Sequence, residues 1–259
     1  MASQPAPTLA NILNHPAVWR IGQMPASLRA AVKTGFASLD QALPAQGWEH
    51  GALTEILSNE QGIGELSLLV PALRQMAQQG QGIVLVAPPY IPFPHAWEAH
   101  GIALKQLLIV RAEGQDALWA AEQAARSGAC GMVVVWTSTC RKEMKYQALR
   151  RLQMAAEAGG TTLVLYRAGN AANEASAAPT RINISAQQGE LQLHIIKRRA
   201  ALMAEALRVN VFPLHWARRT QARAKMALNP PAPNTLQAAG GDLLPLPLRS
   251  LSRTLSASR

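Results

Sequence analysis

A short glycine-containing loop, SNEQGIGEL, has the residue types and spacing closest to a ligand-binding site. Such a loop binds phosphate when backbone amides surround the oxygens, a Lys neutralises their charge and a Ser or Thr ligates magnesium. Gly62 and Gly64 supply the backbone, but Glu65 stands at the Lys position and Leu66 at the Ser/Thr position. A carboxylate repels a triphosphate, so we expect no cofactor and no metal here. Glu65 is either a functional acid or, as we favour, simply a solvated charge or a charge at the N-terminus of a helix, where a carboxylate suits the helix dipole.

A second candidate site is a proline-rich segment after the next apolar run. Its prolines are Pro88, Pro89, Pro92 and Pro94. They form either a groove for a partner or a rigid strand-to-helix loop, and we favour the loop because proline fixes φ. His95 and His100 are five residues apart, which places them on different helical faces and argues against a metal pair. We predict that three tryptophans pack in the core: Trp97, Trp119 and Trp136.

Basic residues gather after the fourth apolar run. They are Arg141, Lys142, Lys145, Arg150 and Arg151. An apolar stripe lies opposite them at helical spacing, formed by Met144, Ala148, Leu152, Ala155 and Ala156, so the charges are expected to face solvent. Such a face either is simply solvated or contacts DNA or a partner, and the sequence leaves both interpretations open.

The net charge of +10 is concentrated in the C-terminal quarter of the chain. Residues 197–259 hold 11 of the 25 Lys and Arg but only 2 of the 15 Asp and Glu. This excess attracts phosphate backbones or acidic protein surfaces. The candidate contacts are Lys197, Arg198, Arg199, Phe212, Trp216, Arg218 and Arg219. Apolar anchors beside Arg are typical of interfaces and of single-strand binders, whereas the alternative is a terminal helix that packs back on the domain.

The overall composition excludes several classes of protein. Hydrophobic residues make up 49% of the 259 residues, enough for a sizeable core. No apolar run is long enough for a membrane helix, and the N-terminus lacks the order of a secretory signal. The two cysteines, Cys130 and Cys140, make neither a disulfide framework nor a zinc site, so we expect inert thiols in a reducing cytoplasm.

Apolar runs alternate with helical stretches between Gly51 and Tyr166, which predicts an α/β fold. The expected strands are Ala52–Leu57, Ile83–Ala87, Leu107–Val110, Met132–Trp136 and Leu163–Tyr166. The expected helices are Glu65–Gln79, Pro94–Ala99, Asp116–Ser127 and Lys142–Ala158, with caps at Gly80, Gly101, Gly128 and Gly159. Runs without alternation indicate strands covered on both faces, hence a mostly parallel sheet with crossover helices.

Three domains or segments are expected along the chain. Residues 1–32 are predicted to be a helical segment and residues 33–196 the α/β domain. The domain is predicted to end in an antiparallel hairpin, Arg181–Ser185 with Glu190–Ile196, that closes one sheet edge. Residues 197–259 are predicted to form a basic, partly disordered interaction tail.

The stretch from Thr34 to Tyr166 resembles the ATPase core of RecA-type recombinases. TGFASLDQAL matches the TG-x-x-x-LD-x-AL pattern of that family, SNEQGIGEL occupies the place of its phosphate loop, and HGIALKQLLIV and ALWAAEQAARSGACGMVVVW continue the similarity. The resemblance implies a RecA-like core. It also implies a catalytic glutamate where this chain has Pro89 in Ala87–Tyr90, and a magnesium-organising aspartate where it has Trp136. Together with Glu65 and Leu66, these replacements remove three functions of the ATPase: neutralising the phosphate charge, activating water and organising the metal. We therefore expect that the protein is not an enzyme and has no catalytic residues.

A narrower family shares these losses. GALTEIL, GIGELSLLVPAL, VAPPYIPF, RRLQMAAEAGG and KRRA are similar to the translesion synthesis-associated ImuA family, which is RecA-like and related to SulA. This resemblance implies a non-catalytic adaptor in a DNA-damage-inducible (SOS) mutasome. Its partners would be the polymerase-like protein ImuB, an error-prone DnaE-type polymerase, and RecA filaments or DNA.

An alternative is a SulA-like inhibitor of cell division that binds FtsZ. The extended stretch TGFASLDQALPAQGWEHG and the basic tail favour the ImuA interpretation, because a small inhibitor needs neither. The expected location is the cytoplasm, with association to the nucleoid when DNA is damaged.

Overall fold

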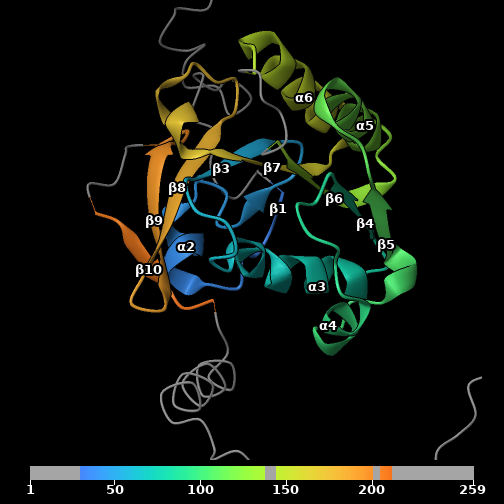
Figure 1. The fold of residues 1–259 in the computed structure, drawn as a ribbon, viewed down its shortest axis with the longest axis horizontal. Helices are drawn as coiled ribbons and strands as arrows, with labels where there is room; N and C mark the ends of the chain where they lie inside the picture. The colour runs from blue at the N-terminus through green and yellow to red at the C-terminus, as the bar shows by residue number, and fades with distance from the viewer. Residues whose placement is uncertain (1–29, 138–143, 201–204, 212–259) are drawn as a thin grey trace, which may run out of the picture. The chain divides into compact units, whose positions relative to one another are not determined.

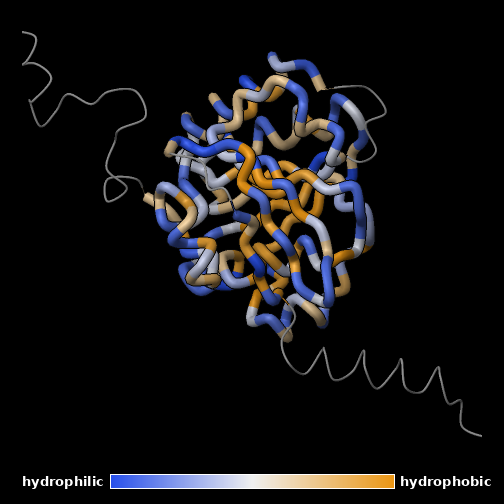
Figure 2. Tube along the Cα trace, turned by 90° about the vertical axis from the view of Figure 1, so that its left-hand side faces the viewer, coloured by the Kyte–Doolittle hydropathy of each residue, from blue (hydrophilic) through white to orange (hydrophobic). Residues whose placement is uncertain are grey.

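Side chains on successive positions of each central strand enter two different apolar cores, which is why the sheet is buried on both faces. The computed structural model describes residues 30–137, 144–200 and 205–211. In β4 (Gly82–Val86), Ile83 and Leu85 join one core whereas Val84 and Val86 join the other. Because strand side chains alternate between faces, continuous apolar runs of this kind require cover on both sides. Figure 2 shows the hydrophobic segments gathered at the centre of the molecule.

The main sheet of the described residues has eight strands in the order β10-β9-β8-β3-β7-β6-β4-β5 (Figure 1). The other parallel strands are β3 (Leu53–Ser58), β6 (Cys130–Trp136), β7 (Thr162–Ala168) and, at one end of the sheet, β5 (Leu107–Val110). They pair in parallel, and β8 (Thr180–Gln187) adds to β3 in the same direction. The predicted hairpin is formed by β8 and β9 (Glu190–Lys197), which pair antiparallel. The mostly parallel α/β sheet predicted from the sequence is therefore confirmed.

Helices cover the two faces in separate groups. On one face lie α2 (Ala37–Ala42), α3 (Val70–Gln78) and α4 (Pro94–Ala99), and on the other α5 (Gly114–Arg126) and α6 (Tyr146–Gly159) (Figure 1). Short 3-10 turns are η2 (Glu65–Leu68), η3 (Leu104–Gln106) and η4 (Gly169–Asn173). Among the helices that the structure describes, none is long and apolar enough to cross a membrane.

The helix predicted over Glu65–Gln79 is instead two elements. A single 3-10 turn, η2, follows the glycine loop, and α3 begins at Val70 with Pro71 in its first turn. Proline has no N–H to donate and its ring collides with the carbonyl four residues earlier, so it is tolerated at a helix start and not in the interior. Pro71 therefore separates the loop from the helix that follows.

The predicted cap at Gly159 is wrong by one residue. Gly160 has the left-handed φ of 63°, whereas Gly159 is the last residue of α6. Gly159 is instead required by packing, because a Cβ there would lie 2.0 Å from the carbonyl oxygen of Ala125 in α5. The glycine allows the C-terminal ends of α5 and α6 to meet.

Regular structure continues beyond the predicted end of the hairpin. Strand β10 (Leu207–Val209) pairs antiparallel with β9, and Val209 and Val211 are buried in the core on the α3 side. Near the other end, β1 (Ala31–Val32) pairs with β2 (Trp48–Glu49) in a second small sheet. The described part of the predicted tail therefore contributes to the sheet.

A buried ion cluster holds the loop that covers the β3–β8 region of the sheet. Glu55 is fully buried, and its carboxylate accepts hydrogen bonds from Arg167 Nη1 at 2.8 Å and Arg181 Nε at 2.5 Å. Arg181 also donates to the carbonyl oxygen of Ala171 in η4 at 2.6 Å. The two guanidinium groups thus compensate the buried carboxylate and fix the loop.

Candidate functional site

The glycine loop lies at the carboxyl end of β3, where ligands commonly bind in parallel α/β sheets. Gly62 and Gly64 have left-handed φ values of 73° and 91°, so both provide a backbone conformation that other residues rarely adopt. The Gly62 N–H donates a hydrogen bond to Glu65 Oε1 at 3.3 Å. Glu65 is half-buried and is the first residue of the 3-10 turn η2, so the expected charge at a helix N-terminus describes it better than the expected solvated charge.

Tyr166 and Trp136 support this loop from two neighbouring strands. The Tyr166 hydroxyl donates to the backbone carbonyl of Glu65 at 2.8 Å, and the Tyr166 ring stacks on Trp136 with centroids 5.2 Å apart. Burial, followed by the negative charge of Glu65, raises the pKa of Tyr166 above its ordinary range. The hydroxyl therefore stays protonated at neutral pH and is available as a donor.

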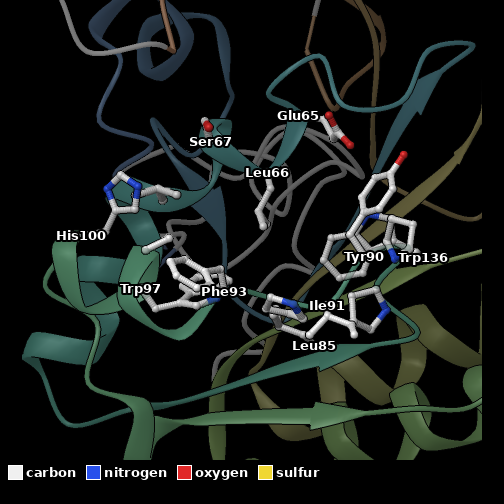
Figure 3. Close-up of a pocket in the computed structure, with 15 residues that line it drawn as sticks. Glu65, Leu66, Ser67, Leu85, Tyr90, Ile91, Phe93, Trp97, His100 and Trp136 are labelled. Atoms are coloured by element: carbon white, nitrogen blue, oxygen red, sulfur yellow. The ribbon is translucent and has the colours of Figure 1, made fainter. Parts of the chain in front are cut away.

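The proline-rich loop after β4 completes an apolar cavity of about 230 Å³ beside the glycine loop. Figure 3 shows Glu65, Tyr90 and Trp136 at one end and Trp97 and His100 at the other. Within this loop, Tyr90, Ile91 and Phe93 expose 63%, 78% and 64% of their surface. A rigid loop that presents three large apolar side chains has the composition of a protein-binding surface.

The cavity offers few groups that could do acid–base or metal chemistry. Its ionisable side chains are Glu65, Tyr90 and His100. Within residues 30–137, 144–200 and 205–211, no cluster of three His, Cys, Asp or Glu side chains is arranged to hold a metal ion. Leu66, Pro89 and Trp136, which the resemblance to RecA-type ATPases singled out, all line this cavity, so the structure brings these three residues together.

The basic face predicted on α6 is separated from the cavity by the sheet. Leu149 and Leu152 of α6 pack in the core on one side, and Trp97 and Trp136 of the cavity belong to the core on the other. The helix begins at Tyr146, so Lys145 precedes it. Arg141 and Lys142 lie outside the described residues.

Two of the basic residues on this face differ in their surroundings. Arg151 pairs with Glu122 of α5, with Nε at 2.9 Å from Oε2. Arg150 is exposed on the helix surface, as is Lys145 before it. Arg150 and Lys145 are therefore better placed than Arg151 for an external contact, and their role in DNA or partner binding stays a prediction.

The three basic residues at the end of β9 and directly after it contact the body of the protein. Lys197 Nζ donates to the Ser176 carbonyl at 2.8 Å, Arg198 donates to the Ala42 carbonyl, and Arg199 pairs with Glu49 at 3.0 Å. Burial, followed by the positive charge of Arg181, lowers the pKa of Lys197. Phe212, Trp216, Arg218 and Arg219 lie outside the described residues.

The sequence did not predict the exposure of Trp119 and of strand β5. Trp119 is 61% exposed on α5 and does not pack in the core as predicted. In β5, Leu108 and Ile109 are 58% and 38% exposed, although the pattern indicated a strand covered on both faces. A short aliphatic run, LLIV, looks the same in sequence whether the strand is central or at an edge.

Cys130 is half-buried, as expected for an inert thiol, and burial raises its pKa. Cys140 lies outside the described residues.

Comparison with known proteins places the chain near RecA. No family model matches it. Over 121 residues, 46% of the chain, it is 35% identical to protein RecA of Thermus aquaticus, and this covers 35% of that protein. It is 32% identical over 120 residues to RecA of Thermus thermophilus and 27% identical over 119 residues to RecA of Bacillus subtilis. The chain thus spans about a third of the length of these relatives, and the RecA-like relationship and core expected from the sequence are confirmed.

Proposed function

We propose that this RecA-like chain is a binding module that does not hydrolyse ATP and that serves as an adaptor in translesion DNA synthesis. The observation that carries the proposal is the hydrogen bond from the Gly62 N–H to the Glu65 carboxylate. The loop amide that would meet a phosphate oxygen meets a carboxylate of the same chain instead. A fixed negative charge at this point opposes the binding of a second anion.

The other altered positions support the same proposal. Leu66 offers no oxygen to magnesium, and Pro89 offers no base to activate water. Trp136 is 5% exposed and stacked on Tyr166, so its indole fills the space beside the loop. An indole has no lone pair for a metal and no acid–base function near neutral pH. These three residues line one cavity, and their side chains together support a chain that does not hydrolyse ATP.

The adaptor role rests on the resemblance to the ImuA family together with the RecA-like relationship. It implies ImuB as the direct partner, with a DnaE-type polymerase, RecA filaments or DNA in the same SOS-induced assembly. Exposed apolar side chains at Tyr90, Ile91 and Phe93 provide a surface for a protein partner. The basic residues between 197 and 259 provide attraction to nucleic acid.

Two measurements on the full chain test this proposal. Isothermal titration with Mg-ATP should give no binding, and a steady-state assay should give no hydrolysis with or without single-stranded DNA. RecA of Thermus aquaticus serves as the positive control. Hydrolysis that responds to single-stranded DNA would overturn the non-catalytic assignment.

The partner assignment needs its own experiment. The tagged full chain is mixed separately with purified ImuB and with purified FtsZ, and co-elution is measured. We expect a complex with ImuB and none with FtsZ. A complex with FtsZ alone would favour the division-inhibitor alternative and contradict the adaptor role. The variant Phe93→Ser, which removes an exposed ring, should weaken the ImuB complex, and Met154→Ser on exposed α6 is the matched control.

A further inference from the structure

The cavity beside the glycine loop has a carboxylate at one end and is largely apolar along the rest of its length. Figure 3 shows Glu65 near Tyr90 and Trp136, with Trp97 at the opposite end. Leu85 of β4 also lines the cavity. A ligand that matches this distribution is apolar along its stem and positively charged at one tip.

No Lys or Arg side chain within the described residues pairs with the Glu65 carboxylate. Its hydrogen bond from the Gly62 N–H is long, at 3.3 Å, and comes from a neutral donor. Because the side chain is half-buried, water and salt screen its negative charge less than they would at the open surface. A cationic ligand would supply the counter-charge that the described part of the chain does not.

A second carboxylate adds to the negative charge at this end. Glu60 lines a polar hollow of about 210 Å³ that shares Glu65 with the apolar cavity, and its side chain is exposed. Arg167 also lines this hollow, but its guanidinium already pairs with Glu55 at 2.8 Å and with Glu174 at 2.5 Å. The arginine is therefore compensated, and the charge facing a ligand is negative.

We propose that this cavity binds an arginine side chain presented by a protein partner, with the guanidinium group at Glu65 and the methylene stem along the apolar walls. Arginine fits better than lysine, because its planar guanidinium can bind a carboxylate through two hydrogen bonds and can stack on aromatic rings. Tyr90 and Trp136 provide such rings at the Glu65 end. The inference rests on the proposed function, in which no triphosphate occupies the glycine loop.

The rim of the cavity indicates that the arginine belongs to a protein and not to a free amino acid. Tyr90, Ile91 and Phe93 line the cavity and also expose most of their surface to solvent. An arginine in a central pocket, surrounded by apolar contacts that exclude water, is typical of the residues that dominate binding energy in protein interfaces. The expected partner segment therefore carries an arginine between apolar residues.

The test titrates the full chain with two short peptides by isothermal calorimetry at low salt. One is acetyl-Leu-Arg-Leu-amide, and in the other citrulline, which has the same shape without the charge, replaces arginine. We expect the arginine peptide to bind at least about tenfold more tightly, as for a hydrogen bond between charged groups. Glu65→Gln should remove this preference by weakening only the arginine peptide.

A matched variant and a spectroscopic readout locate the binding site. Glu98→Gln makes the same change on an exposed α4 carboxylate that does not line the cavity, and should alter the affinity less than about twofold. In nuclear magnetic resonance spectra the indole N–H signals of Trp97 and Trp136 should shift on binding. The signal of Trp119, exposed on α5, should not shift. Thermal unfolding of both variants shows that each is folded.

The possible results separate this inference from the proposed function. Equal binding of the two peptides, unchanged arginine binding by Glu65→Gln, or signal shifts confined to Trp119 would each overturn the arginine site. Mg-ATP binding to the wild-type chain would overturn the proposed function and this inference together. Binding of neither Mg-ATP nor the arginine peptide would overturn this inference alone.

Discussion

Tyr166 connects the glycine loop to Trp136 in the candidate site. Its hydroxyl donates to the Glu65 carbonyl and its ring stacks on Trp136. One side chain on β7 therefore fixes both the glycine loop after β3 and the aromatic wall at the end of β6. The hydrogen bond replaces a contact with water that the buried Tyr166 hydroxyl no longer has.

Removing this hydroxyl should destabilise the protein modestly. We expect Tyr166→Phe to lower the free energy of unfolding by about 1 kcal/mol at neutral pH, the usual value for one buried hydrogen bond. Chemical denaturation followed by circular dichroism measures this. Tyr90→Phe removes a hydroxyl from a side chain that is 63% exposed and is the matched control. An equal loss in both variants would contradict the role assigned to Tyr166.

The same tyrosine predicts how stability responds to alkaline pH. Its pKa is raised in the folded protein by burial and by the Glu65 charge, so folding favours the protonated form. This contribution is complete below the unfolded pKa of about 10 and is lost as the pH rises through the higher folded value. Denaturation at pH 9 and pH 11 should show a smaller loss of stability for Tyr166→Phe than for the wild type. An equal loss of stability between pH 9 and pH 11 in the two proteins would contradict this prediction.

At the scale of elements, two contacts hold α6 in place. Gln153 Oε1 accepts a hydrogen bond from the Leu53 N–H at 2.8 Å, which ties the helix to the start of β3. At its C-terminal end, Gly159 lies against the backbone of α5. Helix α6 is thus held against both β3 and α5. The room for a side chain at Gly159 is limited by backbone atoms of α5, which cannot move aside as a flexible side chain could.

A methyl group at Gly159 should therefore force the helices apart. Gly159→Ala would bring the new Cβ to 2.0 Å from the Ala125 carbonyl oxygen. We expect a loss of about 1–3 kcal/mol in the free energy of unfolding, as for other overpacked sites. Ala158→Ser, which adds one atom at the exposed neighbouring position, should change little. Thermal and chemical denaturation measure both, and a neutral Gly159→Ala would contradict the packing argument.

The buried ion cluster on β3, β7 and β8 provides a second test at this scale. Glu55→Gln leaves Arg167 and Arg181, 7% and 5% exposed, without their shared carboxylate. Breaking a buried pair from one side costs about 3–5 kcal/mol. Arg199→Gln removes the more exposed pair with Glu49 and should cost less than about 1 kcal/mol. Equal effects of the two changes on the denaturation midpoint would contradict the distinction.

At the scale of the whole molecule, charge is distributed very unevenly. The C-terminal 63 residues carry most of the excess of +10, whereas residues 1–196 hold nearly equal numbers of acidic and basic side chains. On α6, Arg151 pairs with Glu122, which also pairs with Arg126, and both Arg150 and Arg151 are exposed. A phosphate backbone would therefore be attracted mainly by the tail, with a smaller contribution from α6.

Binding of single-stranded DNA by the full chain should accordingly be independent of sequence and sensitive to salt. We expect affinity, measured by fluorescence anisotropy, to fall at least about tenfold between 50 and 200 mM salt. Arg150→Glu should weaken binding further. Arg74→Glu, the same charge change on exposed α3 across the sheet, is the control. Binding that is insensitive to salt, or equal effects of the two reversals, would contradict this assignment.

The sequence by itself determined the α/β class, the parallel strands, the hairpin and the residue types that the glycine loop presents. These features follow from local patterns: apolar runs, helical periodicity, glycine caps and the identities of Glu65 and Leu66. The RecA-like core could be recognised in the same way, because the resemblance is carried by the order of short motifs along the chain.

Only the tertiary structure decided which strand lies at an edge, where β10 pairs and what each charge contacts. Strand order depends on contacts between residues far apart in sequence, so LLIV could not be assigned to an open edge from its composition. The partners of Lys197, Arg198 and Arg199 lie on other elements, at Ser176, Ala42 and Glu49. Likewise, Glu65 turns back to Gly62 because the loop geometry and the Tyr166 contact fix its backbone, and residue identity alone does not specify that conformation.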